Sequence, residues 1–144
     1  MSISSGFQVE EPDVLVPWHI TEAELSTLFE GNELRRITSG YYVLRCKSLN
    51  GLSHHLGFHF TPRTDGVLSE FELFRPDVKI ETSYKDFQHH MEACFGQPTS
   101  VSPGTEGFPS QLWQIQDVQI SHSVKEHFGP AEYLKISKIP ARLA

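Results

Sequence analysis

The chain has 144 residues and a formal net charge of −6 at neutral pH, with two cysteines and eight histidines. A chain of this length fits one domain and can bury a core that needs neither a metal ion nor a disulfide. The acidic balance argues against a nucleic-acid partner, because phosphate binding requires a positive surface. We therefore expect an ordinary globular domain without a cofactor.

The patterns along the chain divide it into one domain and two ends. Residues 1–16 are mixed polar and acidic and contain Pro12, so we expect a flexible N-terminal arm there. Residues 17–138 carry the periodic apolar patterns of a single domain. Residues 139–144 follow no such pattern, and we expect them to form a C-terminal tail.

The first predicted element is a short helix. Thr21 and Glu24 have the spacing of a capping box at its start, and Gly31 can take the left-handed conformation at its end. From residue 33 to residue 74 the apolar period changes to two, which predicts strands. Four strands are expected there as an antiparallel meander, with turns at Ser39-Gly40, Asn50-Gly51 and Asp65-Gly66.

A second helix is predicted for the segment SYKDFQHHMEACFG, with Ser83 as its cap and Gly96 at its end. The chain then returns to period two, in three or four further strands. This order predicts an α+β domain in which two helices pack on a curved, mainly antiparallel sheet of about seven or eight strands. The same order also allows two tandem halves, each consisting of a helix and a meander.

The segment SHHLGFHF, residues 53–60, places three histidines within eight positions. A three-residue loop at residues 49–51 would keep the apolar side chains of both flanking strands on one face together with His54. His55 and His59 then point to the other face, and residues four apart on a strand are separated by about 13 Å. Zinc needs its nitrogen ligands at about 2 Å, so this segment predicts a sheet and no metal site.

The open face of the predicted sheet is the candidate site. It collects aromatic, basic, histidine and acidic side chains, which are suited to contact with a partner. The candidate partner-binding residues are Tyr41, Arg45, His55, His59, Glu70 and Glu72. The simpler interpretation of the same side chains is a cross-strand lattice of Arg/Lys, His and Glu on a half-exposed sheet, and the recognition surface is the functional alternative to it.

Other parts of the sequence carry no sign of catalysis. There is no phosphate-binding loop, no nucleophile elbow and no two pairs of closely spaced cysteines, so we predict no catalytic residue and no enzyme. His54 and His122 are expected to point inward from central strands. A hydrogen-bonded core position is the more frequent role of such a histidine, although a Cys–His pair with Cys46 or Cys94 is conceivable.

The expected compartment is the cytoplasm. The segment MSISSGFQVEEPD has no basic start and no apolar run, so we expect no signal peptide. No stretch approaches the roughly 20 apolar residues of a membrane span. Cys46 and Cys94 fall on the apolar faces of their predicted elements, which favours two buried free thiols over a disulfide.

In its small size, its acidity and its order of helix followed by sheet, the segment from residue 18 to residue 138 resembles bacterial immunity proteins, which neutralise a cognate toxin. The resemblance lies in the architecture, without a diagnostic motif, so no functional residue is carried over. It implies a non-enzymatic domain that binds a protein partner. Two alternatives remain: a small-ligand or metal-binding domain, and a homodimer similar to small acidic secretion chaperones.

Overall fold

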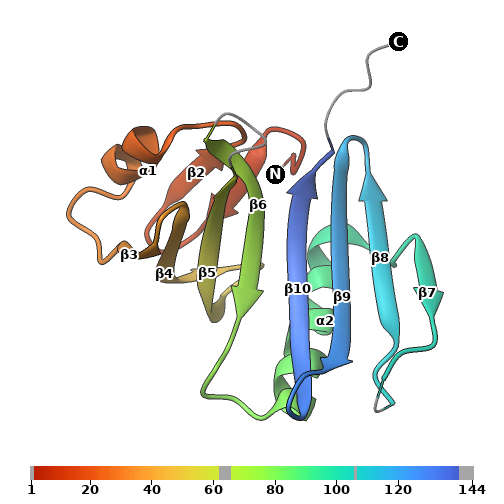
Figure 1. The fold of residues 1–144 in the computed structure, drawn as a ribbon. Helices are drawn as coiled ribbons and strands as arrows, with labels where there is room; N and C mark the ends of the chain where they lie inside the picture. Colours follow the sequence, from red (N-terminus) through yellow and green to blue (C-terminus); the bar gives the residue numbers. More distant parts are fainter. Residues whose placement is uncertain (1, 62–65, 106, 140–144) are drawn as a thin grey trace.

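The computed structural model describes residues 2–61, 66–105 and 107–139, which form two helices and ten strands. In chain order the elements are β1 (Gly6–Val9), β2 (Val14–Pro17), α1 (Glu22–Leu28), β3 (Arg35–Thr38), β4 (Tyr41–Ser48), β5 (Leu52–Thr61), β6 (Val67–Phe74), α2 (Ile80–Phe95), β7 (Ser100–Ser102), β8 (Ser110–Ile115), β9 (Val118–Glu126) and β10 (Pro130–Lys138). Eight strands form one open antiparallel sheet in the order β3-β4-β5-β6-β10-β9-β8-β7, and β1 pairs with β2 (Figure 1). The predicted α+β fold is confirmed.

The two centre strands of the large sheet are β6 and β10. They are antiparallel, with Leu73 opposite Leu134 and Phe71 opposite Ile136. From this pair one meander runs outward to β3 and the other to β7. A helix precedes each meander in the chain. The described residues therefore follow the predicted order of two tandem halves, each a helix and a meander.

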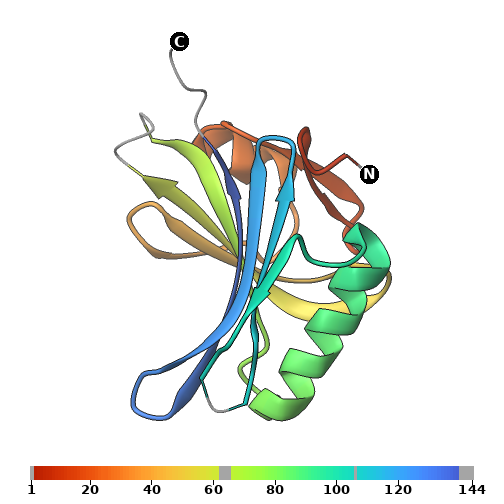
Figure 2. The ribbon, with the colours of Figure 1, turned by 90° about the vertical axis from the view of Figure 1, so that its right-hand side faces the viewer.

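One face of the sheet is covered and buried. Figure 2 shows the strong curvature of the sheet, with α2 packed on one of its faces. The β1–β2 hairpin and α1 lie against the same face: the ring of Phe7 is 5.3 Å and that of Trp18 4.9 Å from the ring of Phe71, and Phe29 is 5.7 Å from Phe58. No described element covers the opposite face, which we call the open face.

The N-terminal residues differ from the expected flexible arm. Gly6–Val9 and Val14–Pro17 form a regular antiparallel hairpin, and the side chains of Phe7 and Val16 are completely buried. The sequence pattern concealed this hairpin because two glutamates and a proline separate the two short apolar runs. Residues 6–17 therefore belong to the folded core.

The Glu10 carboxylate attaches the hairpin to the loop between β4 and β5. Its two oxygens accept hydrogen bonds from the backbone N–H groups of Asn50 and Gly51, each at 2.8 Å. The loop is held from the other side by His90, whose Nδ1 lies 2.6 Å from the carbonyl oxygen of Leu49. A carboxylate that accepts backbone hydrogen bonds is a strong, charge-assisted contact.

The β4–β5 loop has the predicted length and register. Ser48 pairs with Leu52 and Cys46 with His54, so three residues form the turn. Residues 49–51 all have positive φ angles, of 54°, 62° and 89°. Because glycine adopts this region without a steric penalty, its place at the end of the loop suits the turn.

The helix ends agree with expectation in α1 and differ in α2. In α1 the capping box of Thr21 and Glu24 is present, with both reciprocal hydrogen bonds. The second helix begins at Ile80, three residues before the predicted cap. Ser83 therefore lies inside this helix and does not cap it, and its hydroxyl donates to Glu132 Oε1 on the sheet at 2.6 Å.

The remaining expectations concern the ends of elements and the membrane. The turn predicted at Asp65-Gly66 falls partly outside the described residues, and so does the tail beyond Ile139. The N–H group of Ile139 itself is bonded to the carbonyl oxygen of Asp117 at 2.7 Å. Neither of the described helices has the length and apolar character needed to cross a membrane.

Replacing Glu10 with alanine removes the two hydrogen bonds that its carboxylate accepts from the β4–β5 loop. We expect the free energy of unfolding to fall by about 1–2 kcal/mol, because the two N–H groups lose a charged acceptor. Glu11→Ala is the matched control: its exposed carboxylate lies 3.6 Å from Lys47 Nζ, and such a pair contributes less than about 1 kcal/mol. Urea unfolding measures both, and an equal loss in the two variants would contradict the role of Glu10.

Candidate functional site

Strand register decides which side chains of the histidine segment reach the open face. Neighbouring residues on a strand point to opposite faces. On β5, His54 is 5% exposed and points into the core, so His55 and His59 project from the open face. On β4, Tyr41 lies opposite His59 and Arg45 lies opposite His55.

Tyr41, His59 and Glu72 form one contact group on this face. The Tyr41 hydroxyl donates to Glu72 Oε1 at 3.2 Å, and its ring stacks on that of His59 at 4.6 Å. Burial and the Glu72 carboxylate raise the pKa of Tyr41 to about 12, so the phenol is a neutral donor. His59 Nε2 is buried without a hydrogen-bond partner among the described residues and lies 4.0 Å from Glu72 Oε1.

A glycine makes room for this group. The ring of Tyr41 lies over Gly57, where a β-carbon would come within 2.9 Å of the ring. The absence of a side chain at this position therefore allows Tyr41 to lie flat between His59 and Glu72 rather than project into solvent.

The other predicted site residues lie outside that group. Glu70 is 4.0 Å from Lys135 on β10. Arg45 Nε donates to His55 Nε2 at 3.2 Å, and the ring of His55 stacks on Phe74 at 5.2 Å. Burial and then the Arg45 cation lower the pKa of His55, which favours its neutral form. The six predicted residues thus share one face but form separate groups.

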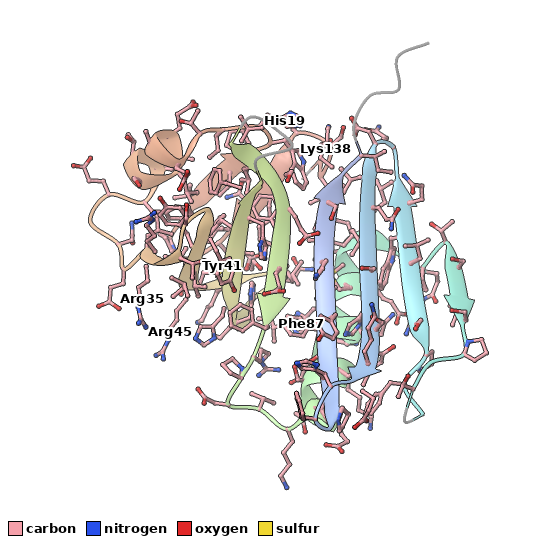
Figure 3. The ribbon with its side chains drawn as sticks, viewed as in Figure 1. His19, Arg35, Tyr41, Arg45, Phe87 and Lys138 are labelled. Atoms are coloured by element: carbon pink, nitrogen blue, oxygen red, sulfur yellow. The ribbon has the colours of Figure 1, made fainter. Side chains whose placement is uncertain are left out.

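The open face is locally basic. Among the described residues, the strand registers place five cations and two carboxylates on it: Arg35, Arg45, Lys47, Lys125 and Lys135 against Glu70 and Glu72. Figure 3 shows Arg35, Tyr41 and Arg45 along the β3–β5 part of this face. The whole sequence contains 12 basic and 18 acidic residues, so cations outnumber carboxylates on this face although carboxylates outnumber cations in the chain.

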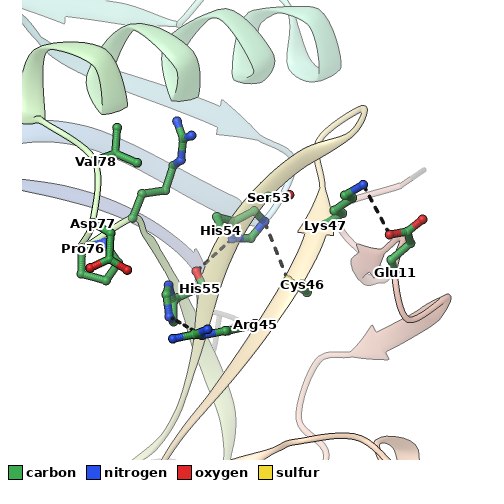
Figure 4. Close-up of a pocket in the computed structure, with 11 residues that line it drawn as sticks. Glu11, Arg45, Cys46, Lys47, Ser53, His54, His55, Pro76, Asp77 and Val78 are labelled. Carbon is green, nitrogen blue, oxygen red and sulfur yellow. Dashed lines mark hydrogen bonds and ion pairs between the residues drawn. The ribbon is translucent and has the colours of Figure 1, made fainter.

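A pocket of about 490 Å³ opens at one end of β4 and β5, next to the segment that joins β6 to α2 (Figure 4). Its lining residues are Glu11, Arg45, Cys46, Lys47, Ser53, His54, His55, Arg75, Pro76, Asp77 and Val78. They come from three distant parts of the chain. Arg45 and His55 were predicted as site residues and His54 and Cys46 as buried ones, but no local motif indicates that the remaining lining residues meet them.

The inner side of the pocket is neutral. His54 Nδ1 is 2.9 Å from the carbonyl oxygen of His55, which can only accept, so Nδ1 carries the hydrogen and Nε2 accepts from the Ser48 hydroxyl. Burial lowers the pKa of His54 to about 4. Burial, with a smaller effect of Glu10, raises the pKa of the Cys46 thiol to about 12.

These protonation states decide the chemistry of the Cys–His contact. Cys46 Sγ lies 3.9 Å from His54 Nε2, but a thiol with so high a pKa remains protonated, and the thiolate is the reactive form. Both cysteines are free, with Cys46 buried and Cys94 partly buried. Among the described residues, no group of three or more His, Cys, Asp or Glu side chains could hold a metal ion.

The second inward histidine, His122, lies in a polar network beneath α2. Its Nε2 is 2.6 Å from Glu132 Oε2, and its Nδ1 is 2.9 Å from Gln88 Oε1. The ring is fully buried and stacks on Tyr84 at 4.1 Å. His122 therefore is a hydrogen-bonded core residue, as expected, and connects α2 to β9 and β10.

Comparison with known proteins gives little similarity. No protein-family model matches the sequence, and a search of curated proteins found no match. Among solved structures, the chain is similar to a DUF4309 family protein (YjgB) from Bacillus subtilis subsp. subtilis str. 168, with 11% sequence identity and a TM-score of 0.46. The similarity covers 82% of this chain and 78% of that chain. It carries no conclusion about function.

His54 is expected to make the fold sensitive to mild acid. Its pKa is about 4 in the folded protein and about 6.5 in an unfolded chain, so the unfolded state binds the proton first as the pH falls. Its contribution to stability is complete above about pH 7 and is lost between about pH 6.5 and pH 4, by at most about 3 kcal/mol.

Urea unfolding of the wild type and of His54→Gln at neutral pH and near pH 4.5 isolates this contribution. The carboxyl groups that titrate in the same range are common to both proteins. The variant is expected to lose about 2–3 kcal/mol less than the wild type between the two pH values. Parallel losses in both proteins would show that His54 is not the group responsible.

Proposed function

We propose that the protein is a non-enzymatic binding domain that docks an acidic segment of another protein on the open face of its sheet. The observation that supports this proposal is the charge imbalance of the strands on that face, five cations against two carboxylates, in a chain with a net charge of −6. One of the five, Lys47, is paired with Glu11, and the other four still outnumber the two carboxylates. An acidic segment is attracted to this face and repelled by the remaining surface. Such an uneven charge distribution orients a partner during encounter.

Aromatic side chains on the same face supply contact area. Tyr133 on β10 lies between two lysines, with the amino groups of Lys125 and Lys135 at 5.6 and 5.7 Å from its ring centroid. Tyr41 is held in place by its hydrogen bond to Glu72. Tyrosine is enriched at the energetic centres of protein interfaces, because it buries a large rigid ring and keeps a polar end. The face therefore suits a partner whose carboxylates alternate with apolar side chains.

The charge of the face can be tested with two variants that change the net charge equally. Lys125→Glu with Lys135→Glu reverses two cations on the open face. Lys79→Glu with Lys85→Glu reverses two exposed cations at the start of α2, which packs on the other face. Fluorescence anisotropy with labelled poly-L-glutamate is expected to show at least about tenfold weaker binding for the first variant, equivalent to about 1.4 kcal/mol, and little change for the second.

Two results would contradict the proposal. Equal loss of binding in both variants would show that only the total charge matters. Equally tight binding of poly-L-lysine to the wild type would remove the preference for an acidic partner. Thermal unfolding of each variant verifies that the fold is intact, since all four lysines lie on the surface or on an open strand face.

The natural partner can be identified with the same variants. Proteins captured from the source cells are compared by mass spectrometry, and the expected partner is retained by the wild type and by the α2 variant but released by the open-face variant. A toxin domain among the retained proteins would support the immunity-type inhibition that the sequence resemblance implies. If the chain instead forms a homodimer that only the open-face variant fails to form, the partner on the open face is a second copy of the chain and not an acidic segment of another protein.

A further inference from the structure

We propose that the pocket between β4, β5 and residues 75–78 binds a small zwitterion, an amino-carboxylate with an apolar side chain such as an α-amino acid. The carboxylate group of the ligand would contact Arg45, its ammonium group would contact Asp77, and its side chain would lie against Cys46 and His54. This ligand is chemically distinct from the proposed acidic partner, and the inference does not depend on that partner.

Most of the charges around the pocket are already neutralised within the protein. Lys47 Nζ lies 3.6 Å from Glu11 Oε2. Arg75 Nη1 lies 2.6 Å from Asp86 Oδ2, and its side chain is only 18% exposed. These pairs account for three of the five charged residues that line the pocket.

The two remaining charges have opposite signs and lie on different walls. Arg45 comes from β4, and among the described residues its side chain forms one hydrogen bond, to His55, and no ion pair. Asp77 comes from the segment between β6 and α2, and no described residue forms a hydrogen bond or an ion pair with its carboxylate. In Figure 4 the ring of His55 lies between them. Both charges act on His55, since Arg45 lowers its pKa and Asp77 raises it.

This pair of charges restricts the ligand to one that carries both signs. A simple anion near Arg45 would be repelled by the Asp77 carboxylate, and a simple cation near Asp77 would be repelled by the Arg45 guanidinium. A zwitterion places an opposite charge against each. The planar guanidinium also suits a carboxylate, which it can bind through two parallel hydrogen bonds.

The uncharged part of the pocket selects an apolar side chain. Cys46 is a protonated thiol and His54 a neutral imidazole, so neither brings a charge to the inner side. Pro76 and Val78 form the neighbouring wall. The volume of about 490 Å³ falls within the range of roughly 300–1,000 Å³ that is usual for small-molecule sites.

The test uses ligands that differ by one charge. Nitrogen-15 NMR titrations are run with L-leucine and L-phenylalanine, and with the N-acetyl and carboxamide derivatives of each. At least one of the two amino acids is expected to cause saturable shifts in the amide signals of residues 45–47, 53–55, 75, 77 and 78. Both of its derivatives should bind at least tenfold more weakly. Absence of shifts with both amino acids, or equal binding of either derivative, would overturn the proposal.

Two exposed substitutions assign each charge to its partner. Arg45→Gln should abolish the preference for the amino acid over its carboxamide, and Asp77→Asn should abolish the preference over its N-acetyl derivative. Glu11→Gln is the matched control, because this lining carboxylate already has Lys47 as its partner. Unchanged preferences in Arg45→Gln and Asp77→Asn would overturn the assignment. The variant with Lys125→Glu and Lys135→Glu should keep amino-acid binding, so the two proposals can fail independently.

Discussion

The pairing of β6 with β10 is the contact on which the rest of the architecture depends. It joins a strand from the middle of the chain to the last strand and aligns Leu73 with Leu134 and Phe71 with Ile136, all four pointing to the covered face. A shift of one residue would exchange the inward and outward side chains of one whole meander, because strand side chains alternate. In the observed register both meanders present their apolar side chains to one side. The helices and the N-terminal hairpin can then pack on that side, and the other stays open.

Local features of this arrangement could be predicted from the sequence because each depends on a few neighbouring residues. The capping box of α1 is determined by two side chains three positions apart. The register of β4 and β5 follows from a glycine at the end of residues 49–51 and from the requirement that apolar residues share a face. That register also places His55 and His59 on the open face, so the part of the candidate site that lies on one hairpin was predictable.

Contacts between distant segments could not be predicted in this way. The N-terminal hairpin has short apolar runs that are held in place by distant contacts: Phe7 packs on Phe71, and Glu10 bonds to the β4–β5 loop. Serine is a favoured residue for capping a helix, so Ser83 was predicted as a cap. Its hydroxyl instead donates to Glu132, 49 residues further along the chain. The pocket combines residues near positions 11, 46, 54 and 77, and no spacing in the sequence indicates that they meet. The excess of cations on the open face likewise could not be predicted, because it depends on the strand order that places β4, β9 and β10 in one sheet.

Arg45 connects the two proposed binding regions, since it stands on the open face and also lines the pocket. A zwitterion in the pocket would occupy the guanidinium with its carboxylate and so reduce the positive potential that the neighbouring part of the open face offers to an acidic partner. By thermodynamic linkage, a partner that binds Arg45 must weaken the binding of the zwitterion by the same factor as the zwitterion weakens the binding of the partner. Lys125 and Lys135, which lie on β9 and β10, would be unaffected by an occupied pocket. Competition between the two ligands would therefore be partial, and Arg45→Gln would remove it.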